Sequence, residues 1–401
     1  MGESDEELMV EQDHPWEDRT LNLLQDSKID EELSGGKKNQ KVWKKHKLKW
    51  MKRPMGIPDV ILEIRGEDIR ENALRCLSNF LLEKREEDPE NYHRSGFLLF
   101  HSFGTMAILL QEVIDATMKM VNGNLGVRDS RRLTNVLTLF QAVAANTETR
   151  FSFVQSHIPD FIIPLILFES REEMTDNVRA ISLSVIGILC QAREPEIIQW
   201  AIENNIVDVC DTAIRISSEL CKVIAMHILE AILQDSKGIL YICDPHSDQQ
   251  LRRLIERMII LVDVLSVNQD SSPRLLFHII RCFVLLCTHT RGFTAVVESL
   301  PVALMNNSFQ EIMEEFPIIG KLHEQLLLSI GKATDVSLLP TGEGCEQTRE
   351  TKTNWRSDAI GASASASEES PLLRPIDLNR TDWSRLPDAH CPFMLHSGKE
   401  N

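Results

Sequence analysis

Apolar residues recur at helical spacing in four long stretches of this chain. The stretches begin at Arg132, Arg179, Glu219 and Arg274, and their apolar positions follow one another at steps of one, three and four residues. Such steps place the apolar side chains on one face of an α-helix. Alternation with a period of two, which marks a half-buried strand, is not sustained over a strand length. The pattern therefore predicts an all-α fold.

The spacing of these stretches indicates a repeat protein. Their starts are 47, 40 and 55 residues apart, and shorter helical segments precede each one. A period of about 40 to 47 residues made of two or three helices is typical of armadillo and HEAT repeats. One repeat cannot bury its own apolar face, so neighbouring repeats must stack. We expect an armadillo-type solenoid of about six repeats, with the long third helices lining its concave side.

Three zones differ in composition. Residues 1–58 are acidic as far as Glu32 and then basic, residues 59–332 carry the helical pattern, and residues 333–401 are small, polar and of low complexity. Polar low-complexity segments cannot bury enough apolar surface to fold. We expect one folded domain over 59–332 between two disordered tails.

Charge and cysteine content narrow the function classes. A formal net charge of −17 means that any contact with nucleic acid or an acidic membrane must come from a local patch. Nine cysteines without a C-x-x-C pair, behind an acidic start without a signal sequence, indicate reduced thiols in the cytoplasm or nucleus. No apolar run reaches the ~18 residues that span a bilayer. We expect a soluble protein.

Several motifs occur in a specific order between Ile69 and Phe309. They are "RENAL", "HSFGT", "ETR" beside "HIP", "SLSVIGIL", "YIC" and "PRLLFHIIRCF". Together they resemble the Rcd-one (required for cell differentiation, one) family, which supplies the ninth subunit of the Ccr-Not deadenylase complex. The resemblance implies a six-repeat armadillo domain without catalytic activity, bound to the large NOT scaffold subunit. It also implies docking of tryptophan-bearing peptides from silencing and repressor proteins and, for some members, weak nucleic-acid binding.

The motif "HSFGT", which begins at His101, interrupts an apolar stretch. Catalysis would need a partner base or nucleophile, and no G-x-S-x-G, Walker-type or H-E-x-x-H motif occurs. In a structural interpretation the motif connects two helices, with Gly104 easing a bend and Phe103 packed in the core. The resemblance implies instead that His101, Phe103 and Ala107 bind the NOT scaffold. We favour this docking surface and expect no catalytic residue.

The loop after "YIC" departs from the family pattern. Family members carry a tyrosine and an arginine there that frame pockets for partner tryptophans, whereas this chain has His246 and Asp248. Arg291 keeps another pocket arginine. A guanidinium attracts the indole face and a carboxylate repels it. Tryptophan-peptide binding is therefore in doubt.

The resemblance also implies a concave groove that binds peptide helices. It places three basic residues and one aliphatic residue there, namely Lys222, Arg274, Arg281 and Ile224. Phe277 and Leu285 stand where the family has basic residues, and residues 59–332 hold 25 basic against 37 acidic side chains. We therefore favour a peptide over RNA or DNA in the groove. Solvated or ion-paired arginines are the simpler alternative.

The run from Lys37 to Arg53 holds eight lysines, one arginine and two tryptophans without an acid. Three interpretations fit this run: a solvated tail, a nuclear-import signal or an RNA contact.

Cys282 and Cys287 lie near His278 along the chain, but the helical period places them on different faces of the helix. We therefore expect no metal and no cofactor.

These observations predict a non-catalytic adaptor of the Ccr-Not complex that recruits regulators to mRNA decay and translational repression. A nuclear transcription cofactor that binds nucleic acid through the basic run and the groove is the alternative.

Overall fold

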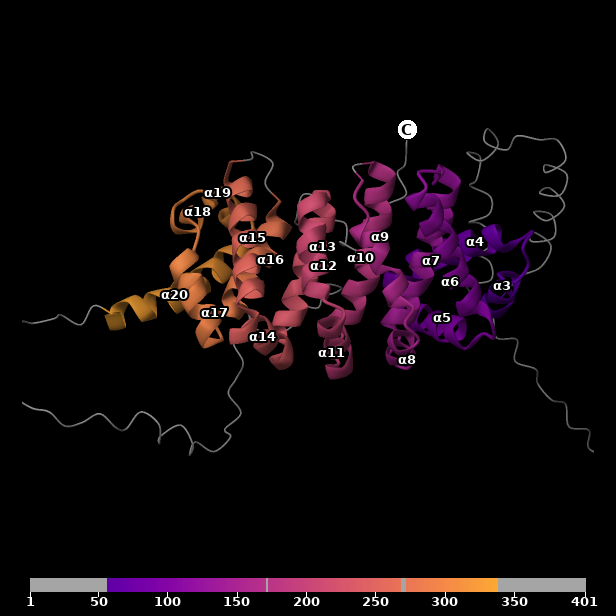
Figure 1. Cartoon of the computed structure of the whole chain (residues 1–401), viewed down its shortest axis with the longest axis horizontal. Coiled ribbons are helices and arrows are strands. Elements are labelled where there is room, and N and C mark those ends of the chain that lie inside the picture. Colours follow the sequence, from indigo (N-terminus) through magenta and orange to yellow (C-terminus); the bar gives the residue numbers. More distant parts are fainter. Residues whose placement is uncertain (1–55, 171, 268–271, 338–401) are drawn as a thin grey trace, which may run out of the picture. The chain divides into compact units, whose positions relative to one another are not determined.

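The computed structural model describes residues 56–170, 172–267 and 272–337, which contain helices and no strand (Figure 1). The described residues form two compact units, unit 1 over 56–192 and unit 2 over 193–337. The predicted tails lie almost wholly outside the described residues. Helices begin at Ile57 and end at Ser337, close to the predicted limits of the folded domain.

Unit 1 is built around two long helices, α7 and α10. Its elements are α3 (Ile57–Glu63), α4 (Arg70–Glu87), α5 (Pro89–His101), α6 (Thr105–Val121), α7 (Val127–Ala145), α8 (Arg150–Gln155), η2 (Pro159–Phe161), α9 (Ile163–Leu167) and α10 (Glu173–Gln191). α7 packs against α4, α5, α6 and α10. Because both helices are covered on several sides, their middle turns are buried all round, as in residues 137–140 and 183–186.

Unit 2 is built around α13 and α16 in the same way. Its elements are α11 (Pro195–Glu203), α12 (Ile206–Ile216), α13 (Glu219–Gln234), α14 (Ser236–Ile242), η3 (Pro245–Ser247), α15 (Asp248–Val267), α16 (Pro273–Leu286), α17 (Thr290–Ser299), α18 (Val302–Met305), α19 (Gln310–Glu315) and α20 (Pro317–Ser337). α16 packs against both α13 and α20.

The helix order is that of an armadillo-type array, so the predicted fold class is confirmed. Two shorter helices precede a longer one in α5–α6–α7, α8–α9–α10 and α11–α12–α13, and α14–α15–α16 repeats the three-helix order with α15 as its longest helix. The long helices of successive repeats pack side by side within each unit, α4 with α7 and α7 with α10, then α13 with α16 and α16 with α20. Stacking buries apolar faces that one repeat cannot cover alone.

Two arginines close helix ends inside the core of unit 1. Arg150 donates from Nε to the carbonyl oxygen of Ala144 and from Nη2 to that of Ala145, both at 2.7 Å. Arg179 donates from Nε to the carbonyl oxygen of Ile166 at 3.0 Å. The last carbonyls of a helix have no partner within the helix. The arginine of the "ETR" motif therefore has a structural role at the end of α7.

Two glycines allow close helix contacts in unit 2. A Cβ at Gly238 of α14 would lie 2.0 Å from the carbonyl oxygen of Ile232, and one at Gly292 of α17 would lie 2.3 Å from that of Leu286. Any side chain at these positions would overlap the backbone of the preceding long helix. Packing therefore requires glycine at both.

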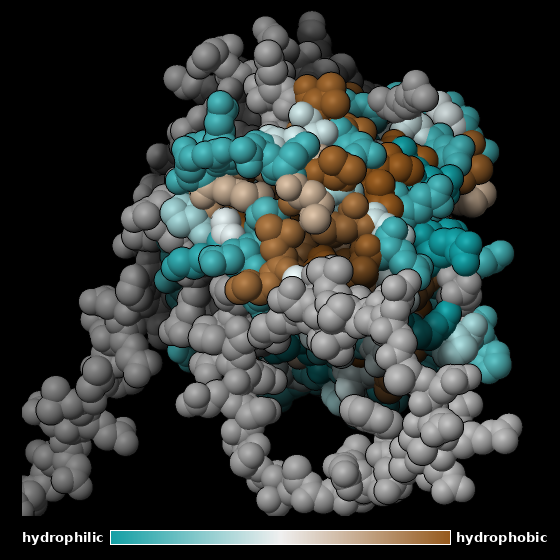
Figure 2. All heavy atoms as spheres, turned by 90° about the vertical axis from the view of Figure 1, so that its left-hand side faces the viewer, coloured by the Kyte–Doolittle hydropathy of each residue, from teal (hydrophilic) through white to brown (hydrophobic). Residues whose placement is uncertain are grey.

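The last repeat of unit 2 exposes apolar side chains. Figure 2 shows apolar residues gathered on the face at the α17–α20 end. Val302 and Met305 of α18 and Leu328 of α20 are 75%, 61% and 57% exposed. No described repeat follows this one in the chain, so no described helix stacks beyond it.

The described residues include seven cysteines, and none of the seven forms a disulfide. Five of them are buried, namely Cys190, Cys210, Cys221, Cys243 and Cys282. The other two, Cys76 and Cys287, are half-buried.

Candidate protein-interaction sites

A tight turn joins α5 to α6 in unit 1. α5 ends at His101, Gly104 has a φ of +76°, and α6 leaves the turn at 89° to α5. This left-handed conformation suits glycine, which has no Cβ to clash. Nη2 of Arg65 donates to the carbonyl oxygen of Phe103 at 2.5 Å and holds the turn from the side of α3.

Among the described helices none could cross a membrane alone by length and composition, and α5 with α6 would do so only as a bent pair.

The side chains at this turn face solvent. Phe103 is 89% exposed, and His101 and Ala107 are exposed as well. The ring of His101 lies against that of Phe97, with 4.3 Å between the ring centroids. The interpretation that packs Phe103 in the core is therefore wrong, although Gly104 does make the bend. His101, Phe103 and Ala107, hereafter the α5–α6 surface, form the kind of exposed aromatic patch that marks interaction sites.

An open pocket of about 650 Å³ lies beside α14 in unit 2. Its lining comes from α11, α14, the loop before η3 and the start of α17, and includes Ile202, Leu240, Tyr241, Pro245 and Arg291. This α14–α17 pocket has the size of a ligand site, with apolar walls and a few polar groups.

The predicted pocket residues lie in or next to this pocket. Arg291 lines it and donates from Nη1 to the carbonyl oxygen of Cys243 at 2.9 Å, which holds α17 against the end of α14. His246 is exposed and follows the lining residue Pro245 directly. Asp248 begins α15, and its side chain lies outside the described residues. The tryptophan-pocket prediction itself stays untested.

The predicted groove residues differ in accessibility, and two need correction. Ile224 and Arg281 are 0% and 1% exposed, so in this structure neither side chain is available to a bound peptide. Arg281 is buried because its guanidinium is paired with Glu230 inside the core. Lys222 and Arg274 are half-buried. At most two of the four predicted residues can thus contact a groove ligand directly.

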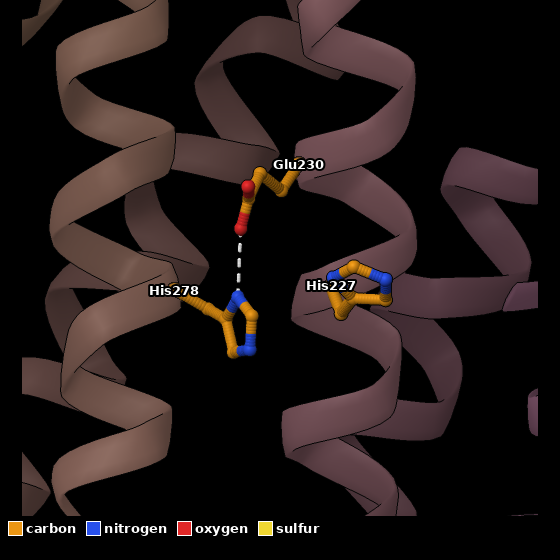
Figure 3. A group of neighbouring side chains, drawn as sticks. All are labelled: His227, Glu230 and His278. Atoms are coloured by element: carbon orange, nitrogen blue, oxygen red, sulfur yellow. Dashed lines mark hydrogen bonds and ion pairs between the residues drawn. The ribbon is translucent and has the colours of Figure 1, made fainter. Parts of the chain in front are cut away.

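A buried polar cluster joins α13 to α16 (Figure 3). Glu230 accepts a hydrogen bond on Oε1 from Nε of Arg281 at 2.5 Å, and its Oε2 lies 2.7 Å from Nδ1 of His278. His227 lies one turn before Glu230 on α13, with its ring centroid 5.2 Å from that of His278. His227, Glu230, His278 and Arg281, hereafter the Glu230 cluster, are each at most 5% exposed.

The cluster keeps one carboxylate charged inside the core. Burial alone raises the pKa of Glu230, but the hydrogen bond and charge of His278 and the charge of Arg281 outweigh it and lower the pKa to about 2. Burial, with the charges of His278 and Arg281, lowers the pKa of His227 to about 3. At neutral pH Glu230 is therefore ionised and His227 is neutral. An ionised Glu230 makes Nδ1 of His278 the donor of their hydrogen bond.

Sequence reasoning missed this cluster. The three-residue spacing of His227 and Glu230 on one helical face is visible in the sequence. Their partners stand about 50 positions later, and nothing in the sequence pairs the two helices at this point. From the sequence, His278 is grouped with the cysteines near it along the chain.

Comparisons with known proteins agree on one family. A sequence model of the "Cell differentiation family, Rcd1-like" matches residues 60–330. "Cell differentiation protein rcd1" of Schizosaccharomyces pombe is 30% identical over 285 residues, which cover 71% of this chain and 96% of that protein. "Protein CAF40" of Saccharomyces cerevisiae is 33% identical over 247 residues, which cover 61% of this chain and 65% of CAF40. The match thus spans less than two thirds of the length of CAF40.

Among solved structures, the chain is similar to designed armadillo repeat proteins. One of them, YIII(Dq)4CqI, has a TM-score of 0.46 at 14% identity, covering 69% of this chain and all of the design. Another, solved in complex with the peptide (KR)4, has a TM-score of 0.47 at 13% identity over the same shares.

Proposed function

Because the chain belongs to the Rcd1-like cell differentiation family, we propose that it is a non-catalytic adaptor subunit of the Ccr-Not deadenylase complex. In this role it binds the NOT scaffold and brings regulators to mRNA deadenylation, decay and translational repression, in the cytoplasm and also in the nucleus. The observation that supports the proposal most is the 89% exposure of Phe103, at a position where the family resemblance implies scaffold binding.

The α5–α6 surface is suited to docking because its shape is fixed before a partner arrives. Gly104 sets the bend, and the hydrogen bond from Arg65 holds the backbone at Phe103. A backbone held in one conformation loses little conformational freedom on binding, so more of the gained contact energy appears as affinity. The small side chain of Ala107 leaves room for a partner to approach the first turn of α6 closely.

The α14–α17 pocket supports the second half of the role, the recruitment of regulators. Ile202 and Leu240 supply apolar wall, and Arg291 supplies a cation at the rim. An aromatic side chain of a peptide fits such surroundings, because it gains both apolar contact and a cation beside its ring. With Asp248 at the adjoining start of α15, affinity for a tryptophan is expected to be modest.

The double substitution Phe103→Ala with Ala107→Tyr tests scaffold binding. The first change removes an aromatic anchor of the kind whose loss costs about 2 kcal/mol or more at an interface, and the second inserts a ring where close approach is needed. We expect the full chain to bind a NOT scaffold fragment at least about 30-fold more weakly in calorimetric titration. Its melting temperature should stay unchanged, because both side chains face solvent.

Val302→Ala is the matched control, since it truncates a side chain that is also exposed but lies in unit 2. It should bind the scaffold fragment like the wild type. Equal affinity of the double variant and the wild type would refute the docking surface. Failure of the wild-type chain to co-purify with deadenylase subunits would refute the adaptor role.

The rival function is nucleic-acid binding through residues 37–53, which lie outside the described residues. The eight lysines and two tryptophans of this segment motivate it. It predicts salt-dependent RNA affinity that is lost when residues 37–53 are deleted and kept when Phe103 is changed.

A further inference from the structure

We propose that His227, Glu230 and His278 form a buried site for a divalent transition-metal ion that joins α13 to α16. Each of the three side chains offers one ligand atom, and these atoms lie within 4.8 Å of one another. Figure 3 shows Glu230 and His278 pointing toward each other between the two helices, with His227 nearby on α13. The proposal is independent of the adaptor role.

The backbone brings these ligands together from two elements. His227 and Glu230 are three residues apart on α13, which puts both on one face of the helix. His278 comes from α16, which packs against that face. Paired ligands at this spacing on one helix, completed from a facing helix, are a common way to build a metal site between helices.

The ligand chemistry selects the class of metal. Two imidazole nitrogens with one carboxylate oxygen suit Zn²⁺ and its neighbours in the first transition row. Ca²⁺ and Mg²⁺ require shells made mainly of oxygen, which this cluster does not supply. Zn²⁺ is therefore the expected ion.

Arg281 orients the carboxylate for this task. Its Nε donates a hydrogen bond to Oε1 of Glu230, which leaves Oε2 directed at the imidazole of His278. A hydrogen bond that fixes a ligating carboxylate in this way raises metal affinity. Nδ1 of His278 donates its hydrogen to Oε2, so coordination through Nδ1 requires this nitrogen to lose that hydrogen and the ring to carry a hydrogen on Nε2 alone.

Small side-chain movements would bring all three ligand atoms to one ion. The positive charge that the ion adds to the core limits the affinity of the cluster for it. Tetrahedral bonds of about 2.0 to 2.2 Å place ligand atoms roughly 3.3 to 3.6 Å apart. Oε2 of Glu230 and Nδ1 of His278 must therefore separate from 2.7 Å, and pairs as wide as 4.8 Å must close, which requires side-chain movements of about 1 Å. Glu230 is already neutralised by Arg281, so a divalent ion adds positive charge to the core. We expect weaker binding than at a thiolate zinc site.

The amount of zinc that stays bound to the full chain after dialysis tests the proposed site. We would dialyse the protein against Zn²⁺ with a non-thiol reductant and measure bound metal in the wild type, in His227→Phe and in His157→Gln. His227→Phe keeps a ring of similar shape in the core while removing the nitrogens. His157→Gln is the matched control, because His157 also lies three residues before an acid, Asp160, and pairs with it on the surface. X-ray absorption of the zinc-loaded wild type reads the ligand atoms directly and needs no variant.

We expect His227→Phe to retain one zinc equivalent fewer than the wild type, and His157→Gln to retain the same amount. The absorption spectrum should show imidazole nitrogen and carboxylate oxygen without sulfur. Equal retention by folded His227→Phe and wild type would overturn the proposal. So would sulfur ligation, which would place the metal on cysteines, or the absence of retained zinc in the wild type.

Discussion

The α5–α6 surface and the Glu230 cluster use similar residue types in opposite surroundings. Each contains histidine and each depends on an arginine, but Phe103 is 89% exposed whereas every member of the Glu230 cluster is at most 5% exposed. Arg65 uses its charge to hold a backbone carbonyl at the surface. Arg281 uses its charge to neutralise a carboxylate in the core.

The difference shows where a polar side chain affects stability and where it affects recognition. At the surface, water competes for every polar group, so removing one costs little in folding. In the core, a charge left without its partner costs several kcal/mol. Changes at the α5–α6 surface should therefore alter partner binding with little effect on folding, whereas loss of a charge in the Glu230 cluster should lower the free energy of unfolding.

The largest loss of stability is expected for Glu230→Ala. It leaves the guanidinium of Arg281 buried without its carboxylate, so we expect the free energy of unfolding to fall by about 3 to 5 kcal/mol. Glu71→Ala is the matched control, because it removes the carboxylate of an exposed ion pair with Arg128 and should cost about 1 kcal/mol or less. Chemical denaturation of both variants decides the matter, and similar losses would contradict the buried charge pair.

A second test concerns the packing that forms the α14–α17 pocket. Gly238→Ala places a Cβ 2.0 Å from the backbone of α13, so we expect a loss of about 1 to 3 kcal/mol in unfolding free energy and weaker peptide binding. Gly331→Ala, in α20, meets no atom within 4 Å and should leave the stability equal or slightly higher. Thermal melting compares them. If the two variants melt together, the close contact of α14 with α13 is not present in solution.

The smallest expected effect is at the loop beside this pocket. His246→Tyr with Asp248→Arg should strengthen binding of a tryptophan-containing peptide by a few-fold, because an exposed cation–π contact is worth about 0.5 to 1 kcal/mol. Adding Arg291→Ala should cancel the gain if the three positions share one pocket. Calorimetric titration measures each step. Unchanged affinity in the restored variant would place the peptide elsewhere.

The parts of the molecule that the sequence could predict are those encoded locally. The helices, the repeat order and the α5–α6 turn each depend on residues close together in the chain. The apolar periodicity was therefore sufficient to predict the helices and repeats, and Gly104 was sufficient to predict the turn. Ile224 and Arg281 were misplaced because their burial depends on contacts with distant residues. A charged residue is rarely buried unless it is paired, and the partner of Arg281 lies 51 positions away. No local pattern reports such a pair.

Buried cysteines in both units can report how often the surrounding helices open to solvent. Thiolates, not thiols, react with alkylating reagents, and burial raises the pKa of Cys190 in α10 to about 12 and that of Cys282 in α16 well above its usual value. At neutral pH each of these thiols becomes reactive only when its helix opens to solvent. The labelling rate of each cysteine then measures the free energy of that local opening. Alkylation followed by mass spectrometry would therefore rank the repeats by how often they open, without any substitution.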